Sequence, residues 1–285
     1  MTKALGIVQG RFGRAALLDM DTSLVGHAHH HCHMLLKVAG SDSDFVVGDT
    51  VLPMRDDTAI LVNAWERHHY EHRSLAQRTL FLALYIEPSW IAEIERSFAP
   101  FGQAGFFVQP CTSIGPEMRR LAQRLAHCLG AGTEAGVGEA TQLISDIVLS
   151  TMHRHLERPT MCAGAVRPRM QDYRIRRALR IMQDNEAPGT LDALAREVGL
   201  SRPHFNQLFR LCTGVSPALY SNALRIERGV NSLAVQRQPV AAVSDQLGFS
   251  AQGNFSRFFT QHTGVTPGSF RRTVTLLGEA PPSQG

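Results

Sequence analysis

Polar side chains recur at helical spacing in two stretches near the C-terminal end of this 285-residue chain. The outward positions are Arg202, Pro203, His204, Asn206, Gln207 and Arg210 in the first stretch, and Gln252, Gly253, Ser256, Arg257 and Thr260 in the second. Arg, Asn and Gln side chains form paired hydrogen bonds with base edges in the DNA major groove. The residue types therefore predict base reading, while a merely solvated polar face is the alternative for either stretch taken alone.

The segments that must position these side chains repeat one pattern. The first copy contains Gly199-Leu200-Ser201, Phe205, Phe209 and Thr213-Gly214-Val215-Ser216-Pro217, and the second contains Gly248-Phe249-Ser250, Phe255, Phe259 and Thr263-Gly264-Val265-Thr266-Pro267. In each copy a short apolar-striped helix ends at a glycine, and a serine (Ser201 or Ser250) is the expected N-cap of the next helix. The phenylalanines then face inward and the polar set outward, as in a helix-turn-helix. We call the second helix of each copy a reading helix.

A longer helical run separates the two copies. It opens at Ser216-Pro217 and has an apolar stripe that includes Tyr220, Ile226 and Val230. A rigid helix here would fix the distance between the reading helices, about 34 Å if they enter successive major grooves on one face of DNA.

Residues 172–272 resemble the DNA-binding domain of the AraC/XylS family of bacterial transcription regulators. Besides the repeated motifs, the matching residues are Leu194-Ala195, Tyr220, Arg225, Ser256-Arg257 and Phe270-Arg271. The resemblance implies a seven-helix, two-module domain that contacts bases through Pro203, Asn206, Gln207, Gln252, Ser256 and Arg257. It also implies a regulator, more often an activator, that acts on promoter DNA with RNA polymerase. Two departures weaken the expectation for the second module: Gly253 offers DNA no side chain, and Ala251 stands where an acidic residue is common.

Charge is distributed unevenly along the chain. Residues 1–166 hold 14 Lys and Arg against 17 Asp and Glu, whereas residues 167–285 hold 15 Arg against 8 Asp and Glu. A basic C-terminal part suits binding to the phosphate backbone. Neither an apolar run of about 18 residues nor a signal peptide is evident. Five scattered cysteines fit reduced thiols, and together these features predict a cytoplasmic protein without a membrane partner.

The N-terminal part has the pattern of a small β-barrel or sandwich. Alternating or β-branched strand candidates lie at Ala15–Leu18, Met34–Val38, Phe45–Val47, Thr50–Leu52, Ile60–Val62 and Leu80–Ile86. Residues 26–70 loosely resemble the cupin-like effector domain of many such regulators. That resemblance implies a small-molecule effector in the barrel interior, where Trp65, Tyr70, Tyr85, Trp90 and Phe106 are candidate lining residues. The alternative for each aromatic is an ordinary core position.

Eight of the thirteen histidines lie between His27 and His72. In an extended chain His27, His29, His31 and His33 share one face. His68, His69 or His72 is the candidate to lie across the barrel from them. Imidazoles so placed can bind zinc, iron, copper or nickel. Our candidate metal ligands are therefore His27, His29, His31, His33 and His68, and the candidate effector contacts are His27, His29, His31, Trp65 and His68. The carboxylate usual in cupin metal sites is missing, so a polar pocket without metal is the alternative, and no other cofactor is expected.

Helical spacing continues at Glu117–Leu129 and Ala140–Leu156, separated by a glycine-rich turn over residues 130–138. The apolar stripe of the second helix suits a homodimer interface, or else a cover for the barrel. The predicted class is thus a two-domain α+β protein: a cupin-like barrel with a helical dimerisation hairpin (1–157), a linker (158–171), an all-α double helix-turn-helix domain (172–273) and a tail (274–285).

Two other functional classes remain open at this point. A metal-dependent cupin enzyme, or a metal sensor, fused to a DNA-binding module would need a complete metal set. A pure interaction scaffold would leave the polar reading faces without a purpose.

Overall fold

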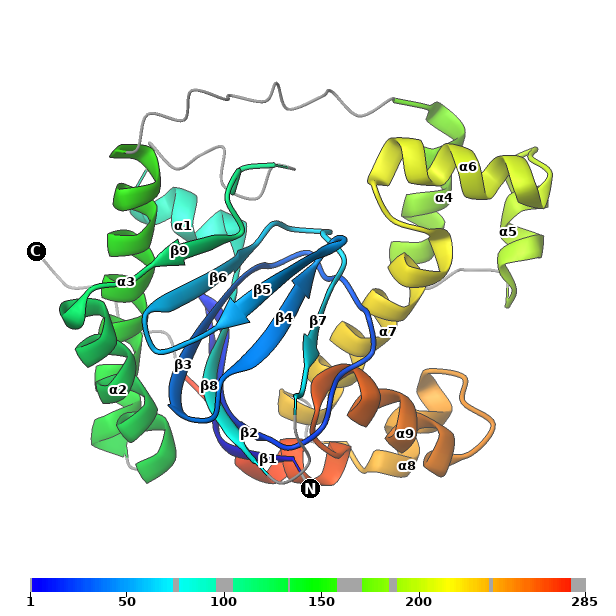
Figure 1. Cartoon of the computed structure of the whole chain (residues 1–285). Coiled ribbons are helices and arrows are strands. Elements are labelled where there is room, and N and C mark those ends of the chain that lie inside the picture. Colours follow the sequence, from blue (N-terminus) through cyan, green and yellow to red (C-terminus); the bar gives the residue numbers. More distant parts are fainter. Residues whose placement is uncertain are drawn as a thin grey trace, which may run out of the picture.

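The computed structural model describes residues 2–73, 77–95, 105–132, 134–157, 171–184, 189–235 and 238–277. It has a β-sheet part with three helices, here the sheet domain (residues 2–157), and a C-terminal part with helices α4 to α10, the helical domain (residues 171–273), as Figure 1 shows. Of the predicted linker (158–171), residues 158–170 fall outside the described residues. None of the described helices is both long and apolar enough to span a membrane.

Two sheets form the core of the sheet domain. The seven-stranded sheet has the order β10 (Val274–Leu276), β1 (Lys3–Gly10), β2 (Gly13–Met20), β8 (Thr79–Ile86), β3 (Cys32–Gly40), β6 (Thr58–Val62) and β9 (Cys111–Ser113). The second sheet has the order β5 (Thr50–Met54), β4 (Ser43–Val47) and β7 (His68–Glu71). Side chains of both sheets, among them Leu35, Phe45 and Phe81, share one buried cluster, so the sheets pack face to face. All six predicted strand segments lie within these strands, whereas β1, β7, β9 and β10 were not predicted.

Helices cover the other face of the large sheet. Helix α1 (Pro88–Ile94) is short, whereas α2 (Pro116–Ala131) and α3 (Glu134–Glu157) form an antiparallel pair along the sheet (Figure 1). The predicted turn over residues 130–138 is wrong for most of its length, because α3 already begins at Glu134. Leu143, Ile144, Ile147, Val148 and Met152 of α3 are buried against the sheet in a single chain. The apolar stripe of α3 therefore covers the sheet within one chain. A dimer interface would have to use other residues.

The helical domain contains α4 (Tyr173–Gln183), α5 (Leu191–Glu197), α6 (Arg202–Thr213), α7 (Pro217–Ala234), α8 (Val240–Gln246), α9 (Gln252–Thr263) and α10 (Pro267–Thr273). Helices α5 and α6 form the first module, and α8 and α9 the second. Gly199 and Gly248, both at φ +72°, make the tight turn within each module, as expected for residues without a Cβ atom. The predicted cap at Ser250 is wrong: Ala251 precedes α9, and the Ser250 hydroxyl accepts a hydrogen bond from Asn254 Nδ2 at 2.9 Å.

The two domains share a continuous apolar core. Residues from α7 and from the second module, including Ile226 and Phe259, belong to the same buried cluster as the inner face of the sheets. Residues 274–276, assigned above to a tail, form β10, which pairs in parallel with β1. On the side of the first module, Trp65 stacks on Tyr220 of α7 with ring centroids 4.4 Å apart. The second module is therefore built onto the sheet domain, whereas the first projects from it (Figure 1).

Candidate nucleic-acid interface and histidine cluster

The first reading helix, α6, has the amphipathic placement that its sequence predicts. Phe205 and Phe209 are fully buried beneath it. Among the predicted contact residues, Pro203, His204, Gln207 and Arg210 are exposed, while Arg202 and Asn206 are half-buried. Arg202 lies 3.8 Å from the Asp192 carboxylate, whereas Arg210 forms no ion pair with any described residue. The exposed face thus offers amide and guanidinium donors to a ligand.

The second reading helix, α9, presents a smaller polar face. Gln252, Gly253 and Arg257 are exposed, and Ser256 and Thr260 are half-buried. The Thr260 hydroxyl donates to the Ser256 carbonyl at 2.7 Å, so it is engaged within the helix. Phe255 and Phe259 are fully buried beneath the helix. Arg257 therefore carries most of the hydrogen-bonding capacity of this face.

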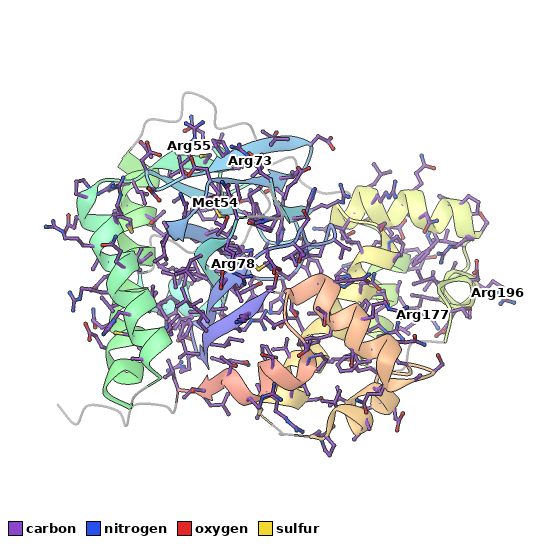
Figure 2. The ribbon with its side chains drawn as sticks, turned by 60° about the horizontal axis from the view of Figure 1, so that its bottom comes forward. Met54, Arg55, Arg73, Arg78, Arg177 and Arg196 are labelled. Atoms are coloured by element: carbon purple, nitrogen blue, oxygen red, sulfur yellow. The ribbon has the colours of Figure 1, made fainter. Side chains whose placement is uncertain are left out.

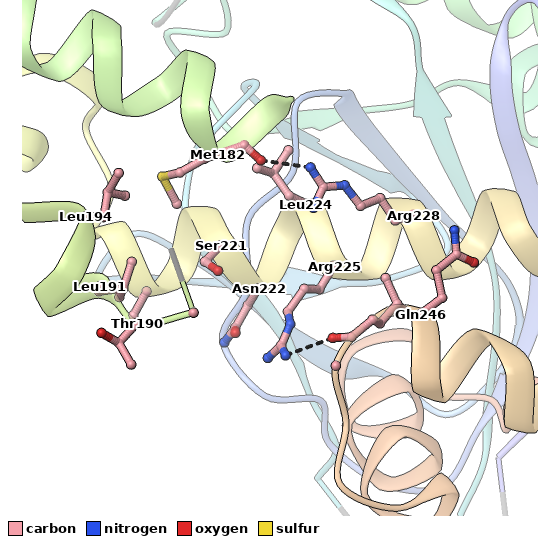
Figure 3. Close-up of a pocket in the computed structure, with 14 residues that line it drawn as sticks. Met182, Thr190, Leu191, Leu194, Ser221, Asn222, Leu224, Arg225, Arg228 and Gln246 are labelled. Atoms are coloured by element: carbon pink, nitrogen blue, oxygen red, sulfur yellow. Dashed lines mark hydrogen bonds between the residues drawn. The ribbon is translucent and has the colours of Figure 1, made fainter. Parts of the chain in front are cut away.

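Two arginines connect helix α7 to α4 and α8. Arg228 donates to the carbonyls of Met182 (2.7 Å, drawn in Figure 3) and Gln183 at the end of α4. Arg225 donates to the Leu247 carbonyl at the end of α8 at 2.9 Å. The Arg225 guanidinium also lies 4.6 Å from the centre of the Phe249 ring. A cleft of about 510 Å³ runs between the modules along α7. Two arginines about one turn apart near the middle of α7 thus tie this helix to the end of α4 and to the end of α8.

Arginines of both domains lie near carboxylates. In the sheet domain Arg73 pairs with Asp44, and Arg78 lies 2.6 Å from Asp19. In the helical domain Arg177 is 3.8 Å from Glu197, and Arg196 points outward from α5 (Figure 2). Ion pairs thus occur in both domains, and the excess of arginine over carboxylates in residues 167–285 is what distinguishes the helical domain. The helical domain is thus the one suited to phosphate contact.

The histidine-rich segment does not keep the predicted alternation, because most of it precedes the strand and His31 groups with His30 instead of with His27 and His29. His27, His29, His31 and His33 are buried, and His30 is half-exposed with its ring 3.3 Å from the Glu87 carboxylate. His68 of β7 is buried across from them. Ligand atoms of His27, His29 and His68 lie within 4.8 Å of one another, and a second set is formed by His30, His31 and Glu87. Of the five candidate ligands, His27, His29 and His68 therefore lie together. His31 turns toward Glu87 instead, and His33 stacks on Tyr85.

Burial keeps the inner imidazoles neutral. Removal from water lowers the pKa of His27 to about 4. The same cause holds the pKa values of His29, His33 and His68 well below the usual value for imidazole. Near pH 7 each of these rings therefore has one protonated nitrogen and one with a free lone pair.

The aromatic residues predicted to line an effector pocket have separate surroundings in the described part of the chain. Tyr70 is a core residue whose hydroxyl bonds Ser43 and His72, Trp90 packs edge-on against Phe12, and Phe106 packs against Phe107. Trp65 stacks on α7 instead. Tyr85 does border a cavity, which lies between the domains and has room for one water-sized species, about 20 Å³.

Three residues at this domain boundary were not predicted. Arg14 lies 3.5 Å from Glu227 of α7 and stacks over the Tyr85 ring at 4.2 Å. His262, near the end of α9, has its ring centroid 6.4 Å from that of His27. Helical spacing marks Glu227 and His262 only as residues off the apolar stripe, so no local signal pairs them with the sheet domain.

Known proteins resemble this chain in sequence and in fold. Residues 194–273 match a family of helix-turn-helix domains. The arabinose operon regulatory protein of Salmonella typhimurium is 29% identical over 220 residues, 76% of this chain and 75% of the relative. The RCS-specific transcriptional activator RclR of Escherichia coli is 31% identical over 100 residues, 34% of this chain and 35% of the relative. The crystal structure of ToxT from Vibrio cholerae covers 96% of this chain and 98% of its own, with a TM-score of 0.52 and 11% identity.

The fold, the paired modules and these relatives define a DNA-binding transcription regulator with an N-terminal β-sheet domain and a C-terminal helical domain. The relatives named above are transcription regulators. The C-terminal helix-turn-helix domain is of the AraC type, as in the arabinose operon regulatory proteins that the chain resembles.

Proposed function

We propose that the chain regulates transcription by reading promoter DNA with α6 and α9 while its sheet domain receives the signal. The observation that carries the proposal is the pair of exposed polar faces, each set on buried phenylalanines. Helix α7 lies between the two modules and is hydrogen-bonded to the ends of α4 and α8. The base contacts assigned to this chain are Asn206 and Gln207 in the first module and Arg257 in the second. Arg202, Pro203, His204, Arg210, Gln252, Ser256 and Thr260 border them.

The sheet domain is proposed to bind a small-molecule effector and to alter the helical domain. ToxT, which shares the fold, has a structure with an unsaturated fatty acid bound. In this chain the sheets contact α7 and the second module through a common core, so a change in the sheets can shift the position of α9. An effector acts by binding one of two arrangements more tightly. Activation through RNA polymerase, and assembly as a homodimer, belong to the same proposal.

The test is a binding measurement with full-length protein and its own upstream DNA. Labelled upstream fragments and a scrambled fragment of equal length are titrated at moderate salt, with and without candidate metabolites. We expect specific binding about 10³-fold or more above the scrambled fragment. Equal affinity for both fragments in every condition would refute base reading. Footprints of the two modules should be centred about one helical turn apart, 10–10.5 base pairs.

A further inference from the structure

Three buried imidazoles from two segments converge at the boundary between the domains. His27 and His29 lie just before β3, and His68 is the first residue of β7. The backbones of His27 and His68 exchange both of their hydrogen bonds, at 3.0 and 2.9 Å, so these segments are held side by side. The three rings offer nitrogens within 4.8 Å of one another. Binding at about 2.0–2.1 Å would draw them to nitrogen separations of about 3.4 Å.

Hydrogen bonds to carbonyl groups orient all three rings in the same way. His27 Nδ1 bonds the Val25 carbonyl at 2.8 Å, His29 Nδ1 the His31 carbonyl at 3.0 Å, and His68 Nδ1 the Glu66 carbonyl at 2.7 Å. A carbonyl oxygen only accepts, so each Nδ1 carries the proton and each Nε2 keeps its lone pair. Metal-binding histidines are held by the same outer contact.

The Nε2 atoms of His29 and His68 make few hydrogen bonds within the described part of the chain. The Nε2 atom of His29 is buried and has no hydrogen-bond partner among the described residues. His68 Nε2 has a single hydrogen-bond partner among the described residues, His33 Nδ1 at 3.4 Å. Buried polar atoms are usually paired, and an orphaned one calls for an explanation. A cation that accepts these lone pairs would provide it.

We propose that His27, His29 and His68 bind one divalent transition-metal ion, of the class that favours neutral imidazole, with Zn²⁺ as its representative. Three histidines leave one position open for water. The cavity of about 20 Å³ beside His27 and His29 has room for a single water and is bordered by Glu227 and His262 of the helical domain.

The site also touches the second reading helix. The Val25 amide donates to the Gln261 carbonyl of α9 at 3.2 Å, and His27 faces His262. Drawing His27 and His29 toward His68 therefore moves the loop that contacts the end of α9. This regulatory step rests on the proposed function, whereas binding of the metal does not.

The test uses full-length protein without a histidine tag, stripped with a chelator. Zn²⁺ is titrated in competition with a chromophoric chelator, and Co²⁺ is added separately to obtain the absorption spectrum of the site. We expect one ion per chain and a tetrahedral Co²⁺ spectrum that Zn²⁺ abolishes. His29→Gln should weaken binding more than about 100-fold, because loss of even an outer contact to a ligand costs about 10–100-fold.

His30→Gln is the matched control, since His30 belongs to the more exposed set with His31 and Glu87. It should leave the affinity for Zn²⁺ unchanged. Loss of binding in His30→Gln but not in His29→Gln would overturn the assignment. Wild-type protein that takes up neither Zn²⁺ nor Co²⁺ at micromolar concentration would overturn the proposal whether or not the variants fold.

DNA binding is measured on the same samples. Zn²⁺ should change the affinity for upstream DNA at least about 5-fold, the lower end of usual coupling between sites, and His29→Gln should remove that change. Binding of the metal without any effect on DNA affinity would overturn the regulatory step and leave the site standing. Specific DNA binding by a protein that takes up no metal would leave the proposed function standing and refute the site.

Discussion

The two helix-turn-helix modules share their sequence pattern but not their surroundings. The phenylalanines of the first module, Phe205 and Phe209, belong to a core made mostly of the helical domain itself. Those of the second, Phe255 and Phe259, belong to the core that continues into the sheets. The reading face of the first module, which projects from the sheet domain, has more exposed hydrogen-bonding side chains than that of the second module, which packs against the sheets. This difference suggests that one module supplies most of the base reading and the other receives the signal.

The largest expected effects come from truncating a buried phenylalanine in each of the two cores. Phe209→Ala and Phe259→Ala should each lower the free energy of unfolding by about 3–5 kcal/mol. Hydrogen exchange should show faster opening of the sheet strands in Phe259→Ala only, because only that ring is part of the shared core. Equal protection of the strands in the two variants would contradict the difference between the modules.

A smaller loss is expected from the ion pair between buried Arg14 and half-buried Glu227, which joins the domains. Arg14→Gln leaves the Glu227 carboxylate with His31 Nδ1 at 3.9 Å as its remaining partner among the described residues. Removal of one partner from a buried pair costs about 3 kcal/mol, which is the upper limit expected here. The matched control is Arg11→Gln, whose partner Glu93 is exposed and whose loss should cost less than about 1 kcal/mol. Chemical denaturation of both variants measures the difference. Similar losses would mean that the Arg14 contact does not hold the domains.

Base reading should divide unequally between the modules. Gln207→Ala and Arg257→Ala should each weaken specific binding by about 1–3 kcal/mol. We expect Gln207→Ala to lower the ratio of specific to scrambled binding more, since Arg257 also suits phosphate. The measurement is a pair of titrations with both DNA fragments. Asn231→Ala, on an exposed position of α7, serves as the control. An equal loss on both fragments in both variants would mean that neither residue reads bases.

The smallest effect tests the glycine in the second reading helix. A Cβ atom at Gly253 meets nothing within 4 Å, so Gly253→Ala should stabilise the chain by about 1 kcal/mol. At Gly264, φ is +79° and an added Cβ lies 3.3 Å from Met20 of the sheet domain, so Gly264→Ala should destabilise. Thermal unfolding of the two variants gives the signs. Destabilisation by Gly253→Ala would show a constraint at this position that the free space does not account for.

Much of the helical domain could be predicted because its signals are local. The spacing of Phe205 and Phe209, the proline after Ser216 and the positive φ required at Gly199 act within a few residues of one another. The strand segments followed from alternation in the same way. The N-cap predicted at Ser250 is wrong by one residue, because the N-cap of α9 is Ala251. Local sequence signals locate the ends of a helix less well than its interior.

The candidate metal site could be predicted only in outline. Alternation in the sequence predicted that His27 and His29 share one face. The loose cupin resemblance made His68 a candidate ligand. Which histidines share a ligand depends on the carbonyl groups of Val25, His31 and Glu66, and these are positioned by backbone pairing between distant segments.

By itself the sequence determined the two modules, their outward polar faces and the separation of an acidic part from a basic part, because helical and strand periodicity are properties of neighbouring residues. Only the tertiary structure decided that α3 covers the sheet, that β10 pairs with β1, and that Arg14 meets Glu227. Periodicity shows which side of an element is apolar, but the partner of that side is chosen by packing across the whole chain.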